Sequence, residues 1–319
     1  MRELGCRGSR VREVPLSNVW LMRAYWLNTA SWSRIVTQRV RRPESIAERL
    51  ASRRRPDQLV PPDGQLVLIG CNHRFDPRTG EPVDRRELLD RVIEALSIPE
   101  VDGVVASADM LEELTLLNVL EHRLAFCTTS GDPHVGAASG GTSSRGGVAP
   151  STVAAGNFDG GVLSPRWGAS GSRLGSQPWS VAADVVELGT SGLPAVVDVH
   201  ITNPTGGAEF DTAWSDWIGP LHATTSALAT GAGVWITVPA ITGLAHLAEA
   251  TGFPMLMRDT ELPIAARAWQ SFFREELPLT IRGMIPGASA LFPLEGTVAE
   301  ASAIIARSVR DRVANPRAA

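Results

Sequence analysis

From residue 64 onward, the chain alternates between short apolar runs and longer amphipathic stretches. Eight runs rich in β-branched residues predict strands, at 65–71, 101–107, 123–129, 158–164, 194–201, 233–239, 253–259 and 279–285. Apolar residues at helical spacing predict helices between most of them, over 85–96, 108–121, 180–189, 224–231, 244–252 and 262–276, with a last one over 298–313.

This order of elements predicts the fold class. Regular alternation of strands and helices is typical of a parallel α/β sheet, and eight repeats over about 250 residues predict a closed (β/α)8 TIM barrel. A doubly wound open sheet is the structural alternative. It would normally carry a G-x-G-x-x-G turn after its first strand, and residues 72–80 read NHRFDPRTG instead.

The region between the third and fourth predicted strands is different. Residues 131–147 are small and polar, rich in glycine and without periodicity, which predicts a flexible βα loop. On a barrel such a loop lies at the end where active sites form. It is therefore either a lid or a tolerated insertion.

Charge is distributed unevenly. Residues 1–55 hold 13 Arg and 4 Glu, a net charge of +9, whereas the rest of the chain carries −13. We interpret residues 1–38 as a basic N-terminal extension and residues 39–319 as one barrel domain. No recognised nucleic-acid-binding module accompanies the basic segment, so nucleic acid is not a predicted partner.

Composition limits the classes of protein further. A chain of 319 residues with 44% hydrophobic residues can bury a full core. No uncharged apolar run is long enough to span a bilayer, and no secretory signal pattern is present, so we predict a cytoplasmic protein without a membrane partner. The three cysteines are widely spaced, which favours reduced thiols. The oligomeric state stays open, a homo-oligomer included.

All 30 basic side chains are arginine, and the chain contains no lysine. A GC-rich genome is enough to explain such a bias. Its chemical consequence does not depend on the cause: no side-chain amine is available to form a Schiff base with a carbonyl substrate.

Candidate acid/base residues lie on the fifth predicted strand. Asp198 and His200 stand two residues apart in VVDVHI, so both side chains project to one face of the sheet. A carboxylate beside an imidazole can orient the ring for general acid/base catalysis. His73 follows the first strand, and with Asp198 and His200 it would supply two imidazoles and a carboxylate to a divalent metal, the alternative to a cofactor-free site. Asp109 follows the second strand, where a helix N-cap is the competing interpretation.

The sequence also resembles a known family. VDGVVASADMLEELTLLNVLEHRLAF, with PESIAERLASRRR and LVLIGCNH before it, resembles actinobacterial aldolase-like (β/α)8 proteins found near inositol-catabolism genes. These are relatives of deoxyribose-phosphate and class I fructose-bisphosphate aldolases. The resemblance runs from about residue 40 to the C-terminus and is weakest in the glycine-rich loop.

The resemblance implies both a site and its loss. It places Asp109 near the substrate, and also His73, which stands beside Asn72. It further aligns Asp159-Gly160-Gly161 with a family strand in which the Schiff-base lysine comes one position later. That position is Val162 here, and the alternative lysine position on strand six is Thr237. Glycines expected after strands seven and eight, where a phosphate would bind, read Arg258-Asp259 and Gly287-Ala288.

We therefore predict a diverged enzyme acting on a small carbonyl or polyol metabolite by non-covalent acid/base chemistry. The reaction would be of lyase or isomerase type and would suit a specialised biosynthetic pathway. The predicted catalytic residues are Asp198, His200, His73 and Asp109, and the predicted substrate-binding residues are Asn72, Asp159, Thr237 and Arg258. The alternative is a catalytically inactive barrel that serves as a ligand-binding or scaffold protein.

Overall fold

The computed structural model describes most of the chain between residues 27 and 314. The described ranges are 27–71, 73, 75–129, 148–168, 178–202, 214–228, 233–240, 244–259, 262–274 and 277–314. Asn72 and the glycine-rich loop predicted at 131–147 lie outside them. None of the helices within these ranges is long and apolar enough to cross a membrane.

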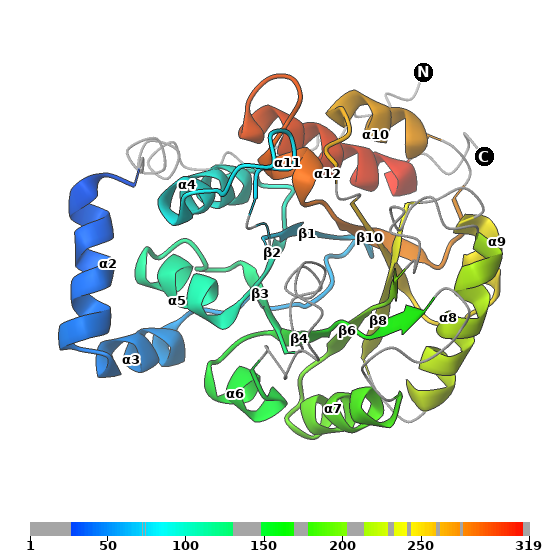
Figure 1. Ribbon diagram of the computed structural model, residues 1–319, viewed down its shortest axis with the longest axis horizontal. Helices are drawn as coiled ribbons and strands as arrows, with labels where there is room; N and C mark the ends of the chain where they lie inside the picture. Colours follow the sequence, from blue (N-terminus) through cyan, green and yellow to red (C-terminus); the bar gives the residue numbers. More distant parts are fainter. Residues whose placement is uncertain are drawn as a thin grey trace, which may run out of the picture.

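Eight parallel strands close into a barrel, seen end-on at the centre of Figure 1. They are β1 (Leu66–Gly70), β2 (Gly103–Ala106), β3 (Leu124–Thr128), β4 (Gly160–Leu163), β6 (Ala195–Asp198), β8 (Val234–Pro239), β9 (Met255–Arg258) and β10 (Ile281–Ile285). Each lies within one of the eight predicted runs, and neighbours around the barrel follow one another in sequence. The predicted TIM barrel is therefore confirmed.

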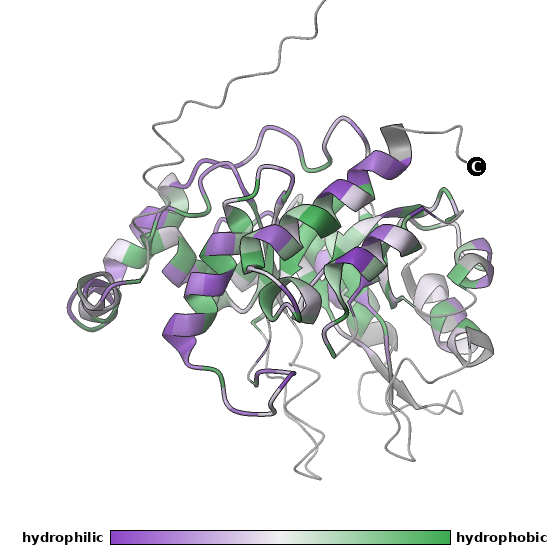
Figure 2. Ribbon diagram, turned by 90° about the horizontal axis from the view of Figure 1, so that it is seen from above, coloured by the Kyte–Doolittle hydropathy of each residue, from purple (hydrophilic) through white to green (hydrophobic). Residues whose placement is uncertain are grey.

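Alternation along the strands separates two cores. On β1, Leu66 and Leu68 point into the barrel with Phe126 and Trp235, whereas Val67 and Ile69 belong to the layer between strands and helices. Successive strand residues face opposite sides of a sheet, so both faces need apolar side chains. Figure 2 shows the result, with hydrophobic residues gathered inside and hydrophilic residues on the outer faces of the helices.

Helices form the outer ring (Figure 1). They are α4 (Arg85–Leu96), α5 (Ala108–Leu116), α6 (Pro150–Ala155), α7 (Pro178–Thr190), α8 (Trp214–Leu228), α9 (Leu244–Glu249), α10 (Ala266–Phe272), α11 (Ala288–Leu291) and α12 (Val298–Ala314). Three differ most from the prediction. α8 begins ten residues earlier than expected, because Pro220 inside it conceals the pattern. Neither α6 nor the short α11 after β10 was predicted.

The N-terminal boundary was placed wrongly. α2 (Thr29–Arg41) spans the predicted border between residues 38 and 39, and α3 (Glu44–Ser52) follows after Pro43. Leu27 and Ile35 are buried in the main core, and Arg39 of α2 forms ion pairs with Glu112 and Glu113 of α5. Part of the basic segment thus belongs to the barrel domain and meets acidic residues of the same chain.

The fifth predicted strand is interrupted. β6 ends at Asp198, and the chain resumes as β7 (His200–Thr202), which leaves the barrel and pairs in parallel with β5 (Arg166–Gly168). The backbone N–H of His200 donates to Pro165 O at 3.0 Å. A small two-stranded sheet therefore extends from the ends of β4 and β6 and fixes the backbone of His200.

Candidate active site

Polar side chains meet where β6, β8 and β9 end. Asp198 pairs in register with Thr237 of β8, and Pro239 of β8 pairs with Arg258 of β9. Asp198, Thr237 and Arg258 share the alternation of the interior residues Val196, Trp235 and Leu256. Active sites of TIM barrels form at this C-terminal end of the strands.

Asp198 joins a histidine and an arginine. His200 Nε2 lies 2.8 Å from Asp198 Oδ2, and Arg258 Nε lies 2.9 Å from Asp198 Oδ1. The three side chains are only 10%, 14% and 16% exposed for His200, Asp198 and Arg258. In such a poorly solvated place these charge contacts are stronger than on an open surface.

The contact orients the imidazole. An ionised carboxylate can only accept hydrogen bonds, so Nε2 of His200 carries the proton that faces Asp198, and in the neutral form of the ring Nδ1 holds the lone pair. An imidazole held in this tautomer can take a proton at Nδ1, and the carboxylate stabilises the cation that results. The predicted contact between Asp198 and His200 is therefore present, although a strand break separates them.

Thr237 is sealed within the barrel. Its side chain has no exposed surface, and its hydroxyl has no hydrogen-bond partner among the described residues. Val162, the other position where the resemblance expects a lysine, lies in the apolar interior cluster. A ligand would reach Thr237 only after neighbouring side chains moved, so a direct substrate contact by Thr237 stays a prediction.

His73 lies at the opposite side of the mouth, against the loop that follows β10. Its ring packs edge-on against Phe292 with centroids 5.5 Å apart, and its Nε2 is so close to Gly287 that a Cβ there would approach it to 2.8 Å. Among the described residues, no group of three or more His, Cys, Asp or Glu side chains is arranged to hold a metal ion. The alternative metal site formed by His73, Asp198 and His200 is therefore not supported.

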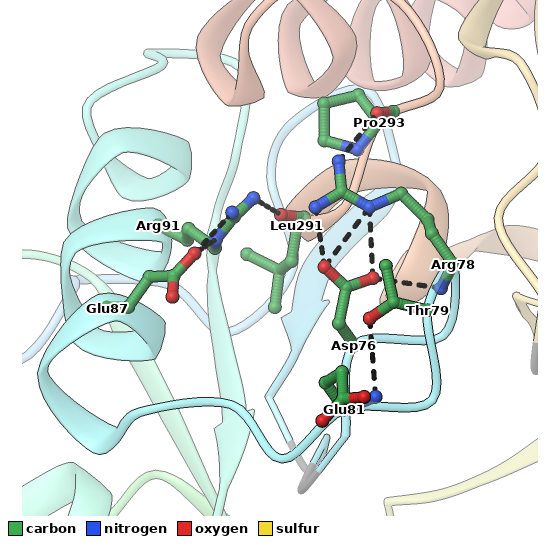
Figure 3. A network of polar contacts seen from close by, with 8 residues as sticks. All are labelled: Asp76, Arg78, Thr79, Glu81, Glu87, Arg91, Leu291 and Pro293. Atoms are coloured by element: carbon green, nitrogen blue, oxygen red, sulfur yellow. Dashed lines mark hydrogen bonds and ion pairs between the residues drawn. The ribbon is translucent and has the colours of Figure 1, made fainter.

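Residues next to His73 anchor the loop between β1 and α4, as Figure 3 shows. Arg78 forms a bidentate ion pair with Asp76 and donates to Pro293 O, and the guanidinium groups of Arg78 and Arg91 lie over the Phe292 ring. The hydrogen bonds from Arg78 hold the pKa of the Asp76 carboxyl below its usual value. Asp76 is thus engaged in positioning this loop.

Asp109 lies on the rim, at the second residue of α5. Its side chain is 55% exposed and pairs with Arg85 Nη2 at 2.7 Å. Burial tends to raise the pKa of this carboxyl, but a hydrogen bond from Ser107 and the charge of Arg85 outweigh burial and lower it. The N-cap of α5 is Ser107, so the interpretation of Asp109 as the N-cap is wrong, although its contacts tie it to the start of this helix and to Arg85 of α4.

Asp159 lies at the other end of the barrel, and its assignment to the substrate site is corrected. It precedes β4, accepts a hydrogen bond from Ala125 N at 2.8 Å and pairs with Arg53 Nη2 at 2.7 Å. Arg53 is fully buried and also donates to the carbonyls of Arg123 and Asn157. Because parallel strands begin at the N-terminal end, Asp159 and Arg53 close the bottom of the barrel, away from the mouth.

One polar residue of the mouth was missed as a site residue. Asp259 directly follows Arg258 and is 5% exposed. Its Oδ2 accepts from the backbone N–H groups of Gly287 and Ser289 at 3.1 and 2.6 Å, and its Oδ1 accepts from Ser289 Oγ at 2.9 Å. In the sequence, the only indication was an acidic residue where the resemblance expects a glycine. It did not reveal that Gly287 and Ser289 would be its partners.

The fold and the position of the polar cluster define a class, the aldolase-type (β/α)8 barrels. Within it, a family model described as Cgl0159-like matches residues 75–306. The chain belongs to this family. A search of curated proteins finds no match.

Solved structures agree with this class. Cgl0159 from Corynebacterium glutamicum is similar with a TM-score of 0.77 and 23% identity, over 89% of this chain and 98% of that one. An archaeal fructose-1,6-bisphosphate aldolase, solved with its catalytic lysine bound to the carbinolamine intermediate, has a TM-score of 0.58 and 11% identity, over 83% and 99% of the two chains. Fructose-bisphosphate aldolase from Slackia heliotrinireducens has a TM-score of 0.58 and 13% identity, over 79% and 85%. At these identities the likeness shows the fold.

Proposed function

We propose that the protein catalyses proton transfer on a small carbonyl or polyol metabolite, in a lyase-type or isomerase-type reaction without a covalent enzyme–substrate intermediate. The observation that carries the proposal is the contact of Asp198 with both His200 and Arg258 at the strand ends. A base, its orienting carboxylate and a fixed cation are the groups that such a reaction needs.

Each group has a distinct part in the proposed reaction. His200 takes a proton from a carbon next to the carbonyl, or from a hydroxyl, through Nδ1, while Asp198 keeps the ring in place. Removing the proton from carbon gives an enolate, with negative charge on the carbonyl oxygen. Removing it from a β-hydroxyl turns that group into a new carbonyl as the C–C bond breaks, and the electron pair of this bond passes to an enolate on the other fragment. In both cases Arg258 supplies a positive charge to stabilise the enolate oxygen. A lysine would achieve the same by forming an iminium ion, but this chain has none.

Solvent deuterium exchange tests the proposal without knowledge of the physiological substrate. A panel of small hydroxy-ketones, aldoses and polyol-derived ketones is incubated with the protein in D2O, and deuterium at the carbon next to the carbonyl is followed by NMR. We expect incorporation that falls by about a hundredfold or more in His200→Gln and Asp198→Asn. His200→Gln should keep a melting temperature near that of the wild type, and Asp198→Asn, which leaves Arg258 without its carboxylate, should be less stable but still folded at the assay temperature.

The alternative function, an inactive ligand-binding or scaffold barrel, is favoured by one observation. Thr237 and Val162 are closed off from solvent, so the positions aligned with the missing lysines are filled by packing. No exchange with any compound of the panel, or exchange unchanged in both variants, would favour this alternative over the enzyme.

A further inference from the structure

Asp259 occupies a place where many TIM barrels bind phosphate. In such barrels the loops after strands seven and eight and the N-terminus of a short extra helix form the phosphate site. Here β9 and β10 are the seventh and eighth strands, and the short α11 follows β10. The same elements are present, so the question is what their backbone N–H groups bind.

The carboxylate of Asp259 binds these backbone N–H groups. Oδ2 accepts from Gly287 N and Ser289 N, and Oδ1 accepts from Ser289 Oγ. The Ser289 hydroxyl in turn accepts from Ile264 N at 2.8 Å. Donors that could hold phosphate oxygens are therefore engaged by an anion of the protein itself.

The backbone N–H groups of Gly287 and Ser289 are also covered by neighbouring side chains. Ser289 and Ala288 have no exposed surface, and Asp259 is almost fully buried. The ring of His73 covers Gly287, since a Cβ on Gly287 would lie 2.8 Å from His73 Nε2. A phosphate group would have to displace both the carboxylate and the ring.

The charges near Asp259 also disfavour a bound phosphate. The nearest cation along the chain, Arg258, reaches across β8 to Asp198 on β6, whereas Gly287 and Ser289 follow β10, on the other side of β9. A dianion next to Asp259 would meet a like charge in a poorly solvated place, which is unfavourable.

We infer that Asp259 takes the place of a substrate phosphate, so that the substrate carries no phosphate at this end of the barrel. The statement about the substrate rests on the proposed function. It narrows the substrate class to unphosphorylated hydroxy-carbonyl or polyol compounds. The inference about the site can be tested without any enzymatic turnover, because it concerns only whether these backbone N–H groups bind an external anion.

Titration calorimetry with inorganic phosphate tests the inference. We expect no saturable binding by the wild type in the millimolar range. Asp259→Gly removes the carboxylate and leaves the amides of Gly287 and Ser289 open, so we expect phosphate binding at least about tenfold tighter, since charge-assisted hydrogen bonds of this kind are strong. Asp259→Ser, a smaller change, serves if the glycine variant does not fold.

Two control variants separate the site from general effects. Asp259→Asn keeps a carbonyl oxygen near the same amides, so we expect little gain in phosphate binding. Asp84→Gly removes another helix cap, since Asp84 accepts from Arg86 N and Glu87 N at the start of α4, and it should gain none.

Saturable binding of phosphate by the wild type would overturn the inference, and so would a folded Asp259→Gly or Asp259→Ser variant that binds no better than the wild type. Deuterium exchange and phosphate binding are measured separately. If no deuterium exchange is found, the titration still tests the role of Asp259. If phosphate binds unexpectedly, the exchange experiment still tests proton transfer.

Discussion

The guanidinium of Arg258 on β9 contacts the carboxylate of Asp198 on β6, with Nε 2.9 Å from Oδ1. β8 lies between these two strands, so the arginine side chain reaches over the end of β8 across roughly 10 Å of sheet. It thereby places a positive charge close to the strand end that carries Thr237, one of the positions where the resemblance expects an amine.

A double-mutant cycle should measure this contact. Arg258→Gln and Asp198→Asn should each lower the free energy of unfolding by about 1–3 kcal/mol, because each leaves a poorly solvated charge without its partner. The double variant should cost less than the two single costs together, with a coupling on the order of 0.5–3 kcal/mol. Urea unfolding gives all four values. The more exposed pair Arg39 and Glu112 is the control, with an expected coupling below about 1 kcal/mol, and strictly additive costs at Arg258 and Asp198 would contradict the prediction.

Asp159→Asn should destabilise the fold strongly. The change leaves the fully buried Arg53 guanidinium without its counter-charge, a type of loss that costs about 3–5 kcal/mol. Arg55→Gln is the matched control, because Arg55 is 39% exposed and lies 3.5 Å from the same carboxylate; it should cost less than about 1 kcal/mol. Urea unfolding compares the two. Equal effects would show that burial of Arg53 does not matter.

Trapping with borohydride should leave the barrel unmodified. Reduction fixes a Schiff base to the amine that formed it, and the chain has no lysine. Incubation with aldehydes or ketoses, followed by reduction and peptide mass spectrometry, should therefore find no adduct on peptides from residues 40–319. A class I aldolase treated in parallel is the positive control. An adduct on a barrel peptide would refute non-covalent chemistry.

The thiols of Cys71 and Cys127 should be unreactive in the folded protein. Both are buried, and burial raises the pKa of each to about 12, so the reactive thiolate is scarce at neutral pH. In a Cys6→Ser variant, a thiol reagent at pH 8 should react with neither cysteine until denaturant is added, and then with both. Prompt reaction without denaturant would contradict their burial.

The same pKa shifts predict a loss of stability in alkali. Above the ordinary thiol pKa of 9.0, the unfolded chain loses these protons while the folded protein keeps them up to about pH 12. The unfolded state then binds fewer protons, so stability falls as pH rises through this window. A Cys71→Ala variant should show a shallower fall in urea unfolding measured between pH 8 and 10, and an unchanged slope would count against the shift at Cys71.

The sequence by itself determined the barrel. The eight strand runs were recognisable because both faces of a barrel strand are buried, so each run is continuously apolar and rich in β-branched residues. It also indicated the contact of Asp198 with His200, since residues two apart on an extended chain share a face. The break at Val199 escaped prediction, because β7 forms only by pairing with β5.

Which end of the barrel a residue occupies was harder to predict. Asp159 and Asp198 both stand in apolar runs, but Asp159 precedes the first strand residue and Asp198 is the last. That difference of a few residues moves a carboxylate from the mouth to the bottom. Strand limits depend on which backbone groups find partners on neighbouring strands, and these come from other parts of the chain.

Only the tertiary structure decided the long-range polar contacts. Asp259 meets Ser289 thirty residues later, Arg258 meets Asp198 sixty residues earlier, and Arg53 meets Asp159 across 106 residues. Periodicity reports the local backbone geometry and the side of an element that is buried. It carries no record of which charged groups are brought together when the barrel closes, and those pairs fix what the mouth can bind.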